Sequence, residues 1–305
     1  MTTLPEIIVT LGPCDDMRAE VFVRLAGDVP AGSRIVGSVT GPRRGRDTTL
    51  PVTSRLIPLA EAAAAGPASR AILTEPAFWT PDLPNLYRVE ASLDPQGSDS
   101  WAADTWIGLR RLGVRGRSFW LDGRRWVPRV VVGPGDLVAA KAAAIGLAAE
   151  SPADELLSRA DETGVAVVPL LDGGSLTPAG IAAWARHPSA MLAVITAGGA
   201  TADVADRLAA VRGAKDTLLI GVTVDGTRPP PVGPAGGDFL VVMLPAAGLP
   251  HAGWRAASVP PLVAWRQAAD KASPRASCDA LQRDLALWGL GGGAPSWDWA
   301  GYLVG

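Results

Sequence analysis

The sequence predicts two domains of different class: an immunoglobulin-like β-sandwich over residues 1–112 and a small (β/α)₈ TIM-type barrel over residues 113–305. Two observations carry this prediction. Up to residue 110, short runs alternate apolar and polar side chains without a long helical pattern, which is typical of half-buried strands. From residue 118 onward, continuous apolar runs alternate with alanine-rich helical segments, which is typical of a parallel sheet covered by helices.

The first domain contains seven short runs that predict the strands of a sandwich. Val21, Val23 and Leu25 would face one side of their strand, because successive side chains point to opposite faces. Turn signals such as Gly41-Pro42 and Gly66-Pro67 separate the runs. The expected strands are 7–11, 19–25, 34–39, 52–59, 70–73, 87–93 and 103–109.

The second domain contains eight apolar runs that predict the strands of the barrel. Helix boundaries are signalled by Asp136 as an N-cap, by Thr177-Pro178 at a helix start and by Gly164 at a helix end. The expected strands are 126–132, 146–150, 165–171, 191–195, 218–224, 239–244, 261–265 and 299–304.

The barrel is expected to be trimmed on one side. The connection between the fifth and sixth strands is the proline-rich segment 228–231, and neither it nor the next connection shows a helical pattern. An open, doubly wound sheet is the alternative fold.

Composition sets limits on the class of function. The chain has 305 residues, of which 48% are hydrophobic, and its formal net charge is −2. It is long enough to bury two cores, and its charge gives no general attraction to nucleic acid or to a membrane surface. No apolar stretch reaches membrane-spanning length. Two cysteines and two histidines, widely separated, give no metal-ligand spacing, so no metal or other cofactor is expected.

The expected location is the cytoplasm. Residues 1–6 show no basic region followed by an apolar run, as a signal peptide would. Cys14 and Cys278 fall in different predicted domains and are expected to be free thiols, which fits a reducing compartment.

Five motifs follow one another in a recognisable order. Residues 78–87 read Phe-Trp-Thr-Pro-Asp-Leu-Pro-Asn-Leu-Tyr, residues 107–110 read Ile-Gly-Leu-Arg and residues 119–124 read Phe-Trp-Leu-Asp-Gly-Arg. Residues 160–165 then read Ala-Asp-Glu-Thr-Gly-Val, and residues 187–189 read His-Pro-Ser. This order resembles glycoside hydrolase family 2, the family of β-galactosidases and β-glucuronidases. The resemblance implies an immunoglobulin-like domain that leads into a catalytic barrel.

The same resemblance implies that two catalytic glutamates of the family are missing here. In the family, a glutamate after asparagine ends the fourth strand as the general acid/base, and a second glutamate ends the seventh strand as the nucleophile. Here the fourth strand ends in Ile195-Thr196 and the seventh in Trp265-Arg266-Gln267. A retaining glycosidase holds its two carboxyl groups about 5 to 5.5 Å apart. The resemblance therefore predicts a scaffold that lacks its catalytic pair, and no catalytic residue is assigned.

Other residues are expected at the functional end of the barrel, where the strands finish. Glu150 and Asp172 follow neighbouring strands and are weak candidates for acid/base chemistry. The competing interpretation is that Glu150 caps or forms a salt bridge and that Asp172-Gly173-Gly174 is a turn. The residues expected to bind a ligand there are Glu150, Asp172, Thr196, Asp225, Trp265 and Arg266.

Trp265 and Arg266 could instead have purely structural roles. A flat indole such as Trp265 can stack on a sugar ring, but tryptophan also fills cores. Arg266 can bind a carboxylate or phosphate, or it can form an ordinary salt bridge.

Three functions follow as hypotheses. The first is an inactive family 2 homologue that binds carbohydrate or a protein partner. The second is an active glycoside hydrolase that uses Glu150 and Asp172 as a relocated pair. The third is a structural or assembly protein whose barrel is closed by its own loops. Neither nucleic acid nor a membrane is an expected partner, and the fold alone does not decide among the three.

Overall fold

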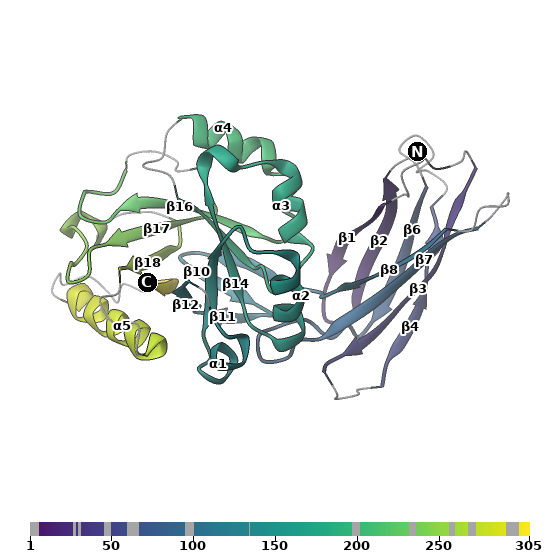
Figure 1. Ribbon diagram of the computed structural model, residues 1–305, viewed down its shortest axis with the longest axis horizontal. Coiled ribbons are helices and arrows are strands. Elements are labelled where there is room, and N and C mark those ends of the chain that lie inside the picture. The colour runs from purple at the N-terminus through teal and green to yellow at the C-terminus, as the bar shows by residue number, and fades with distance from the viewer. Residues whose placement is uncertain are drawn as a thin grey trace. The chain divides into compact units, whose positions relative to one another are not determined.

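The computed structural model describes residues 6–26, 29, 32–45, 50–59, 67–94, 101–133, 135–196, 202–231, 236–255, 260–267, 273–290 and 299–305. The chain divides into two compact units, Met1–Arg110 and Arg111–Gly305. The first is built of strands, and the second combines strands with helices (Figure 1).

The first unit is the predicted β-sandwich, made of two four-stranded antiparallel sheets. One sheet has the order β1-β2-β6-β5, formed by Glu6–Cys14, Arg18–Ala26, Ala68–Thr74 and Ile57–Pro58. The other has the order β4-β3-β7-β8, formed by Val52–Arg55, Arg34–Arg43, Leu86–Asp94 and Ala102–Ile107.

Alternation along the strands builds the sandwich core. On β2, Val21, Val23 and Leu25 are buried as expected, and they pack in one cluster with Ile35 of β3 and Val89 of β7. The core therefore joins the inner faces of the two sheets, as in other sandwiches.

The expected strand 52–59 is wrong in one respect, because it divides at Leu56. β4 pairs with β3 in one sheet, whereas β5 pairs with β6 in the other. Leu56 itself is buried, and its backbone N–H donates to the carbonyl of Gly37 at 2.9 Å. A periodic apolar run cannot reveal which sheet each half joins, because that choice depends on distant strands.

The segment 78–87 forms a hydrogen-bonded loop. Trp79 is fully buried, and Asn85 Nδ2 donates to the carbonyl of Phe78 at 2.9 Å. The Tyr87 hydroxyl accepts from the backbone N–H of Ala77 at 2.8 Å. Burial raises the pKa of Tyr87, although that hydrogen bond acts in the opposite direction. The motif residues thus hold the loop together.

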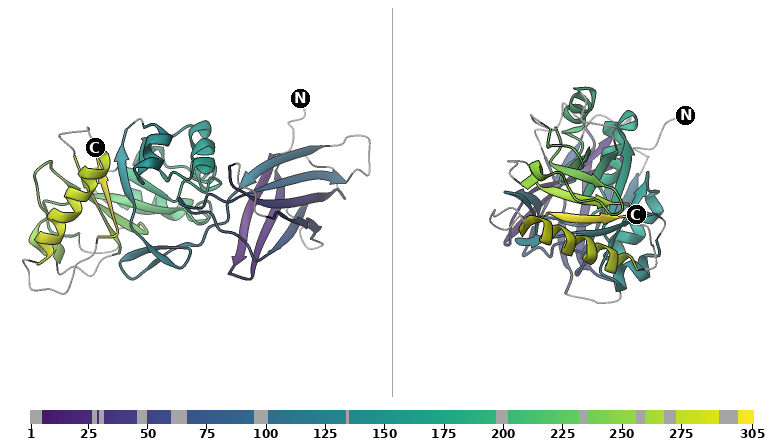
Figure 2. Two further views of the ribbon diagram at one scale, coloured as in Figure 1. Left: turned by 90° about the horizontal axis from the view of Figure 1, so that it is seen from below. Right: turned by 90° about the vertical axis from the view of Figure 1, so that its left-hand side faces the viewer.

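The second unit is a closed barrel of eight parallel strands, so the open-sheet alternative is excluded. The strands are β12 Arg129–Val132, β13 Gly146–Glu150, β14 Val167–Asp172, β15 Leu192–Thr196, β16 Leu219–Asp225, β17 Phe239–Leu244, β18 Leu262–Arg266 and β19 Gly301–Val304. The helices are α1 Leu137–Ala142, α2 Asp154–Thr163, α3 Pro178–Ala185, α4 Ala202–Val211 and α5 Pro274–Leu290, and α5 packs along β19 and β12 (Figure 2).

The expected first barrel strand, 126–132, is also divided. Its first residue ends β11 (Arg124–Trp126), which pairs antiparallel with β10 (Ser118–Leu121), and β10 in turn pairs with β9 (Leu112–Arg115). Only β12 enters the barrel. Pro128 lies between the two strands and has no N–H for a sheet hydrogen bond, which explains the break.

The predicted helix boundaries are confirmed. Asp136 Oδ1 accepts from the backbone N–H of Val138 at 2.8 Å and caps α1. Gly164 ends α2 in the left-handed region with φ 73°, where glycine has no steric penalty. Thr177 caps α3, and Pro178 occupies its first turn.

The described residues agree with the prediction that one side of the barrel lacks covering helices. Between β16 and β17, and between β17 and β18, the described residues form no α-helix; they contain only the short 3₁₀ helix η3, Ala252–Arg255. Trp254 of η3 is fully buried and packs with outer residues of β17 and β18, so it covers part of the face that a helix would cover.

Aromatic side chains fill the amino-terminal end of the barrel. Phe239, the first residue of β17, is fully buried, and a Cβ atom added to Gly221 of β16 would lie 2.2 Å from its ring. Phe119 of β10 packs edge-on against Phe239, with ring centroids 5.2 Å apart and an interplanar angle of 87°. The small antiparallel sheet therefore supplies the floor of the barrel.

Candidate functional site at the barrel mouth

The mouth, as the name is used below, is the set of carboxyl-terminal strand ends of the barrel. Three predicted residues end consecutive strands there: Glu150 on β13, Asp172 on β14 and Thr196 on β15. Asp172 and Thr196 are register partners. Glu150 is paired with Leu170, so Asp172 lies two residues further along the neighbouring strand.

The direction of these side chains follows from their neighbours. Leu147, Leu171 and Ile195 lie in the apolar cluster between the strands and the helices. Because side chains alternate along a strand, Glu150, Asp172 and Thr196 occupy the opposite, inward-facing positions.

Local hydrogen bonds engage two of the three residues. Asp172 Oδ2 accepts from the backbone N–H of Gly174 at 2.9 Å and caps a 3₁₀ turn, η2 (Gly173–Ser175). Thr196 Oγ1 donates to the carbonyl of Leu171 at 3.2 Å. Glu150 and Asp172 are exposed, and in the described ranges no cationic side chain pairs with either carboxylate. Asp172 therefore does take part in a turn, as the competing interpretation had it.

Asp225, at the end of β16, is held by its own turn. Its Oδ1 atom accepts from the Thr227 hydroxyl at 2.7 Å and from the Thr227 N–H at 2.9 Å, and Arg228 lies 3.3 Å from Oδ2. The hydrogen bonds from Thr227, assisted by the charge of Arg228, lower the pKa of Asp225. This carboxyl group therefore stays ionised in mild acid and is poorly suited to donate a proton.

Trp265 and Arg266 lie on opposite faces of β18. Trp265 is buried, and its Nε1–H donates to the carbonyl of Gly305 at 3.3 Å. Arg266 Nη1 lies 2.6 Å from Asp284 Oδ2 on α5, and Nη2 donates to the carbonyl of Gly248 at 3.2 Å. The guanidinium is thus directed to the helix layer and forms the salt bridge of the alternative interpretation.

The residue after Glu150 is one that the sequence did not reveal. Ser151 has φ 41°, in the left-handed region that non-glycine residues rarely adopt. Its backbone N–H donates to the carbonyl of Leu170 at 3.3 Å, which holds the chain as it leaves β13. Strained positions of this kind are concentrated at functional sites. A serine carries no sequence signal for such a conformation.

Within the described residues, no group of three or more histidine, cysteine, aspartate or glutamate side chains is arranged to hold a metal ion. Over the same part of the chain, no helix has both the length and the apolar character needed to cross a membrane.

Comparison with known proteins agrees with this architecture. Residues 15–110 match the sequence model of the family described as "Glycosyl hydrolases family 2". In this part of the chain, the sequence is similar to glycoside hydrolase family 2. This match covers the sandwich, whereas the likeness in fold to solved structures also includes the barrel.

Three solved structures illustrate that likeness. A β-glucuronidase from Dictyoglomus thermophilum has a TM-score of 0.65 at 13% identity, with 99% of this chain and 61% of that chain covered. Bacteroides uniformis β-glucuronidase 2, covalently bound to cyclophellitol-6-carboxylate aziridine, has a TM-score of 0.62 at 14% identity, with 98% and 45% covered. A family 2 member from Bacteroides cellulosilyticus has a TM-score of 0.64 at 16% identity, with 98% and 45% covered.

These identities are low enough that the likeness concerns the fold. This chain spans roughly half the length of the solved structures that it matches, between 45% and 61% in the three above. No curated protein matches the sequence.

Proposed function

We propose that this protein binds carbohydrate at the barrel mouth without cleaving it. The observation that carries the proposal is the chemistry of two strand ends: β15 finishes in Thr196, and β18 finishes in Arg266. A hydroxyl and a guanidinium can neither form a glycosyl ester nor protonate a leaving oxygen at neutral pH. A family 2 scaffold with these residues retains a polar mouth but lacks the family's two glutamates.

The remaining groups suit a sugar. Carboxylates and hydroxyls accept and donate hydrogen bonds to ring hydroxyls, and Glu150, Asp172 and Thr196 supply these groups from inward positions on adjacent strands. Trp265 adds an apolar surface from the other side of the barrel. One solved structure with the same fold carries a covalently bound cyclitol-type carboxylate, so a sugar or uronate is the ligand class to test first.

A second function is favoured by one specific observation. Glu150 and Asp172 are exposed carboxylates without a cationic partner among the described residues, and they lie on neighbouring strands. Strands about 4.8 Å apart and a two-residue offset put their Cα atoms roughly 8 Å apart. Because both side chains occupy inward positions, carboxyl groups carried by Cα atoms at this separation can adopt the spacing of about 6.5 to 9.5 Å that inverting glycosidases use. In that case one carboxylic acid would protonate the leaving oxygen while the other activates a water molecule.

Turnover and binding measurements separate the two functions. A panel of 4-nitrophenyl glycosides and glucuronides is incubated with the wild type, Glu150→Gln, Asp172→Asn and the double variant. Glu162→Gln on α2, an exposed glutamate away from the strand ends, is the matched control. Binding of the same compounds is measured by ligand-observed NMR.

The binding proposal expects saturable binding of at least one sugar without release of 4-nitrophenol by any of the proteins. It is overturned if no sugar binds, or if the wild type and Glu162→Gln release 4-nitrophenol. Release that is abolished in Glu150→Gln and Asp172→Asn would instead establish the relocated pair.

A further inference from the structure

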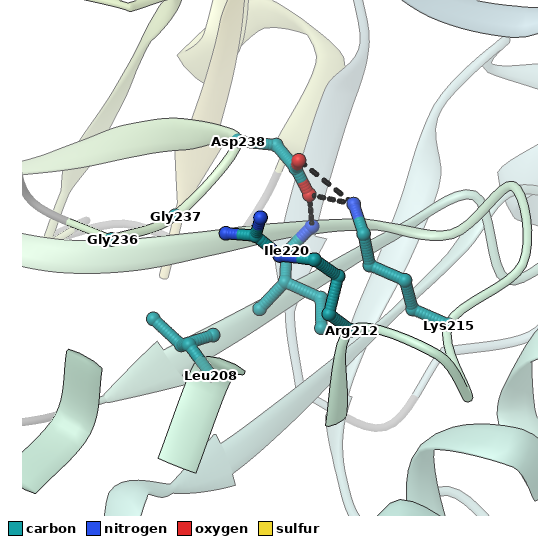
Figure 3. Close-up of a pocket in the computed structure, with 7 residues that line it drawn as sticks. All are labelled: Leu208, Arg212, Lys215, Ile220, Gly236, Gly237 and Asp238. Carbon is teal, nitrogen blue, oxygen red and sulfur yellow. Dashed lines mark hydrogen bonds and ion pairs between the residues drawn. The ribbon is translucent and has the colours of Figure 1, made fainter. Parts of the chain in front are cut away.

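A cavity lies at the amino-terminal end of the barrel. Its volume is about 360 Å³, and its walls come from α4 and the segment that follows it, the start of β16 and the residues before β17 (Figure 3). It is lined by Leu208, Arg212, Lys215, Ile220, Gly236 and Asp238. Because β16 begins at Leu219 and β17 at Phe239, the cavity is at the amino-terminal strand ends, opposite to the mouth.

Among the described residues, two cationic side chains line the cavity, and only one of them is paired. Lys215 Nζ is paired with both oxygens of Asp238, at 2.8 and 2.6 Å. Asp238 Oδ2 also accepts from the backbone N–H of Ile220 at 2.8 Å, which fixes the carboxylate in place. Arg212 also lines the cavity, with an exposed side chain and no hydrogen-bond or ion-pair partner for its guanidinium among the described residues (Figure 3).

Two glycines keep one wall of the cavity bare. Gly236 has φ 77°, and a Cβ atom there would lie 3.3 Å from Leu208 Cδ1. A Cβ atom on Gly237 would lie 2.9 Å from the carbonyl oxygen of Ile220. A side chain at Gly237 would collide with the Ile220 carbonyl, and one at Gly236 would crowd Leu208 and strain a left-handed backbone, so the glycine pair suits this wall of the cavity.

We infer that this cavity binds a small organic monocarboxylate. The planar guanidinium of Arg212 matches the two oxygens of a carboxylate and can bind them in a bidentate manner. Leu208 and Ile220 supply apolar surface for the body of the ligand. A phosphate dianion fits less well, because Asp238 lies in the same cavity and, of the two cationic side chains described there, only Arg212 is left unpaired.

The size of the cavity restricts the ligand further. Ligand cavities in proteins are usually about 300 to 1,000 Å³, and this one is near the lower limit. A single-ring acid is therefore an appropriate probe, and benzoate combines such a ring with one carboxylate. The inference goes beyond carbohydrate binding, because it involves a different end of the barrel and a different ligand class.

Binding of benzoate to the full chain is measured by ligand-observed NMR and by calorimetry, with benzyl alcohol as a neutral analogue of similar shape and inorganic phosphate as a second anion. Benzoate is expected to bind saturably and at least about tenfold more tightly than either, because a charge-assisted hydrogen bond to a carboxylate is lost in the alcohol. Equal binding of benzyl alcohol, tighter binding of phosphate or the absence of saturable benzoate binding would each overturn the inference.

Three variants locate the site. Arg212→Gln is expected to weaken benzoate binding at least about tenfold, whereas Arg159→Gln, which removes an exposed arginine of α2, should leave it unchanged. Asp238→Asn keeps an oxygen for the Ile220 N–H and releases Lys215 from its ion pair, so it should strengthen binding several-fold. Unchanged binding in Arg212→Gln, or weaker binding in a folded Asp238→Asn protein, would contradict the assignment. Circular dichroism confirms that each variant is folded.

Discussion

The imidazole of His187 lies between two carboxylates. Its Nδ1 atom is 2.7 Å from Asp161 Oδ2, and its Nε2 atom is 3.0 Å from Asp154 Oδ1. Asp161 also accepts from the backbone N–H of Ser189 at 2.8 Å. Since Asp154 and Asp161 belong to α2 and His187 precedes β15, this cluster joins a helix to the entrance of a barrel strand. The His-Pro-Ser motif is therefore a structural clamp.

The cluster predicts a pH dependence of stability. Burial alone would lower the pKa of His187, but hydrogen bonds and charge attraction from Asp161 and Asp154 outweigh it and raise the pKa. A raised histidine pKa contributes stability that is complete below the unfolded value of about 6.5 and is lost as the pH rises through the folded value. The free energy of unfolding, measured in urea at a series of pH values, should therefore fall across this range.

Two variants test the origin of that pH dependence. His187→Gln should remove most of the slope above about pH 6.5, whereas His251→Gln, which changes the other histidine of the chain, should retain it. Identical slopes in His187→Gln and the wild type would show that the cluster does not titrate as described.

The close approach of Gly221 and Phe239 predicts a steric conflict. A methyl group at 221 would overlap the Phe239 ring, so Gly221→Ala should lower the free energy of unfolding by about 1 to 3 kcal/mol. The control is Gly113→Ala on β9, where a Cβ atom meets nothing within 4 Å. The double variant Gly221→Ala/Phe239→Leu should recover part of the loss. Additive losses in the double variant would contradict the overlap.

Removal of one hydroxyl should loosen the loop at 78–87. Tyr87→Phe deletes the acceptor for the partly buried backbone N–H of Ala77, and the loss of such a hydrogen bond costs about 0.5 to 1.5 kcal/mol. Native-state hydrogen exchange followed by mass spectrometry should therefore show faster exchange in the peptide that contains Ala77. Peptides from the barrel strands serve as the internal control, and unchanged exchange at Ala77 would indicate a different partner.

Substitution of Arg266 is expected to change the stability of the barrel but not its affinity for a ligand. Because its guanidinium is paired with Asp284 on α5, Arg266→Gln should destabilise the barrel while leaving any sugar affinity at the mouth unaltered. Asp284→Asn should give a similar loss of stability, since it removes the other half of the same pair. Thermal unfolding and sugar titration of both variants provide the measurement. A large loss of sugar affinity in Arg266→Gln alone would show that Arg266 takes part in ligand binding at the mouth.

Local sequence signals predicted most of the architecture. Gly164, Asp136 and the Thr177-Pro178 pair mark helix ends because each acts through its own backbone geometry. The Asp122-Gly123 pair likewise marks the hairpin between β10 and β11. Information of this kind needs no knowledge of distant residues, which is why it was legible in one sequence.

Long-range relationships were not accessible in this way. The division at Leu56 depends on two different partner strands, and the ion pair of Arg266 depends on a helix that begins eight positions later, at Pro274. The Arg212 cavity joins residues from three separate segments, so no local pattern indicates it. At the mouth, the sequence placed Glu150 and Asp172 on neighbouring strands, but their inward direction required the outer core to be known.

The contact between Phe119 and Phe239 has a practical corollary for anyone dissecting this polypeptide. A fragment that starts at Arg129, the first residue of the barrel strand β12, would lack Phe119. The amino-terminal end of the barrel would then be exposed to water. A fragment that starts at Arg111 would keep it. The β10–β11 hairpin thus covers the amino-terminal end of the barrel. The barrel should therefore stay folded when proteolysis removes residues before this hairpin, but not when it cuts within the hairpin.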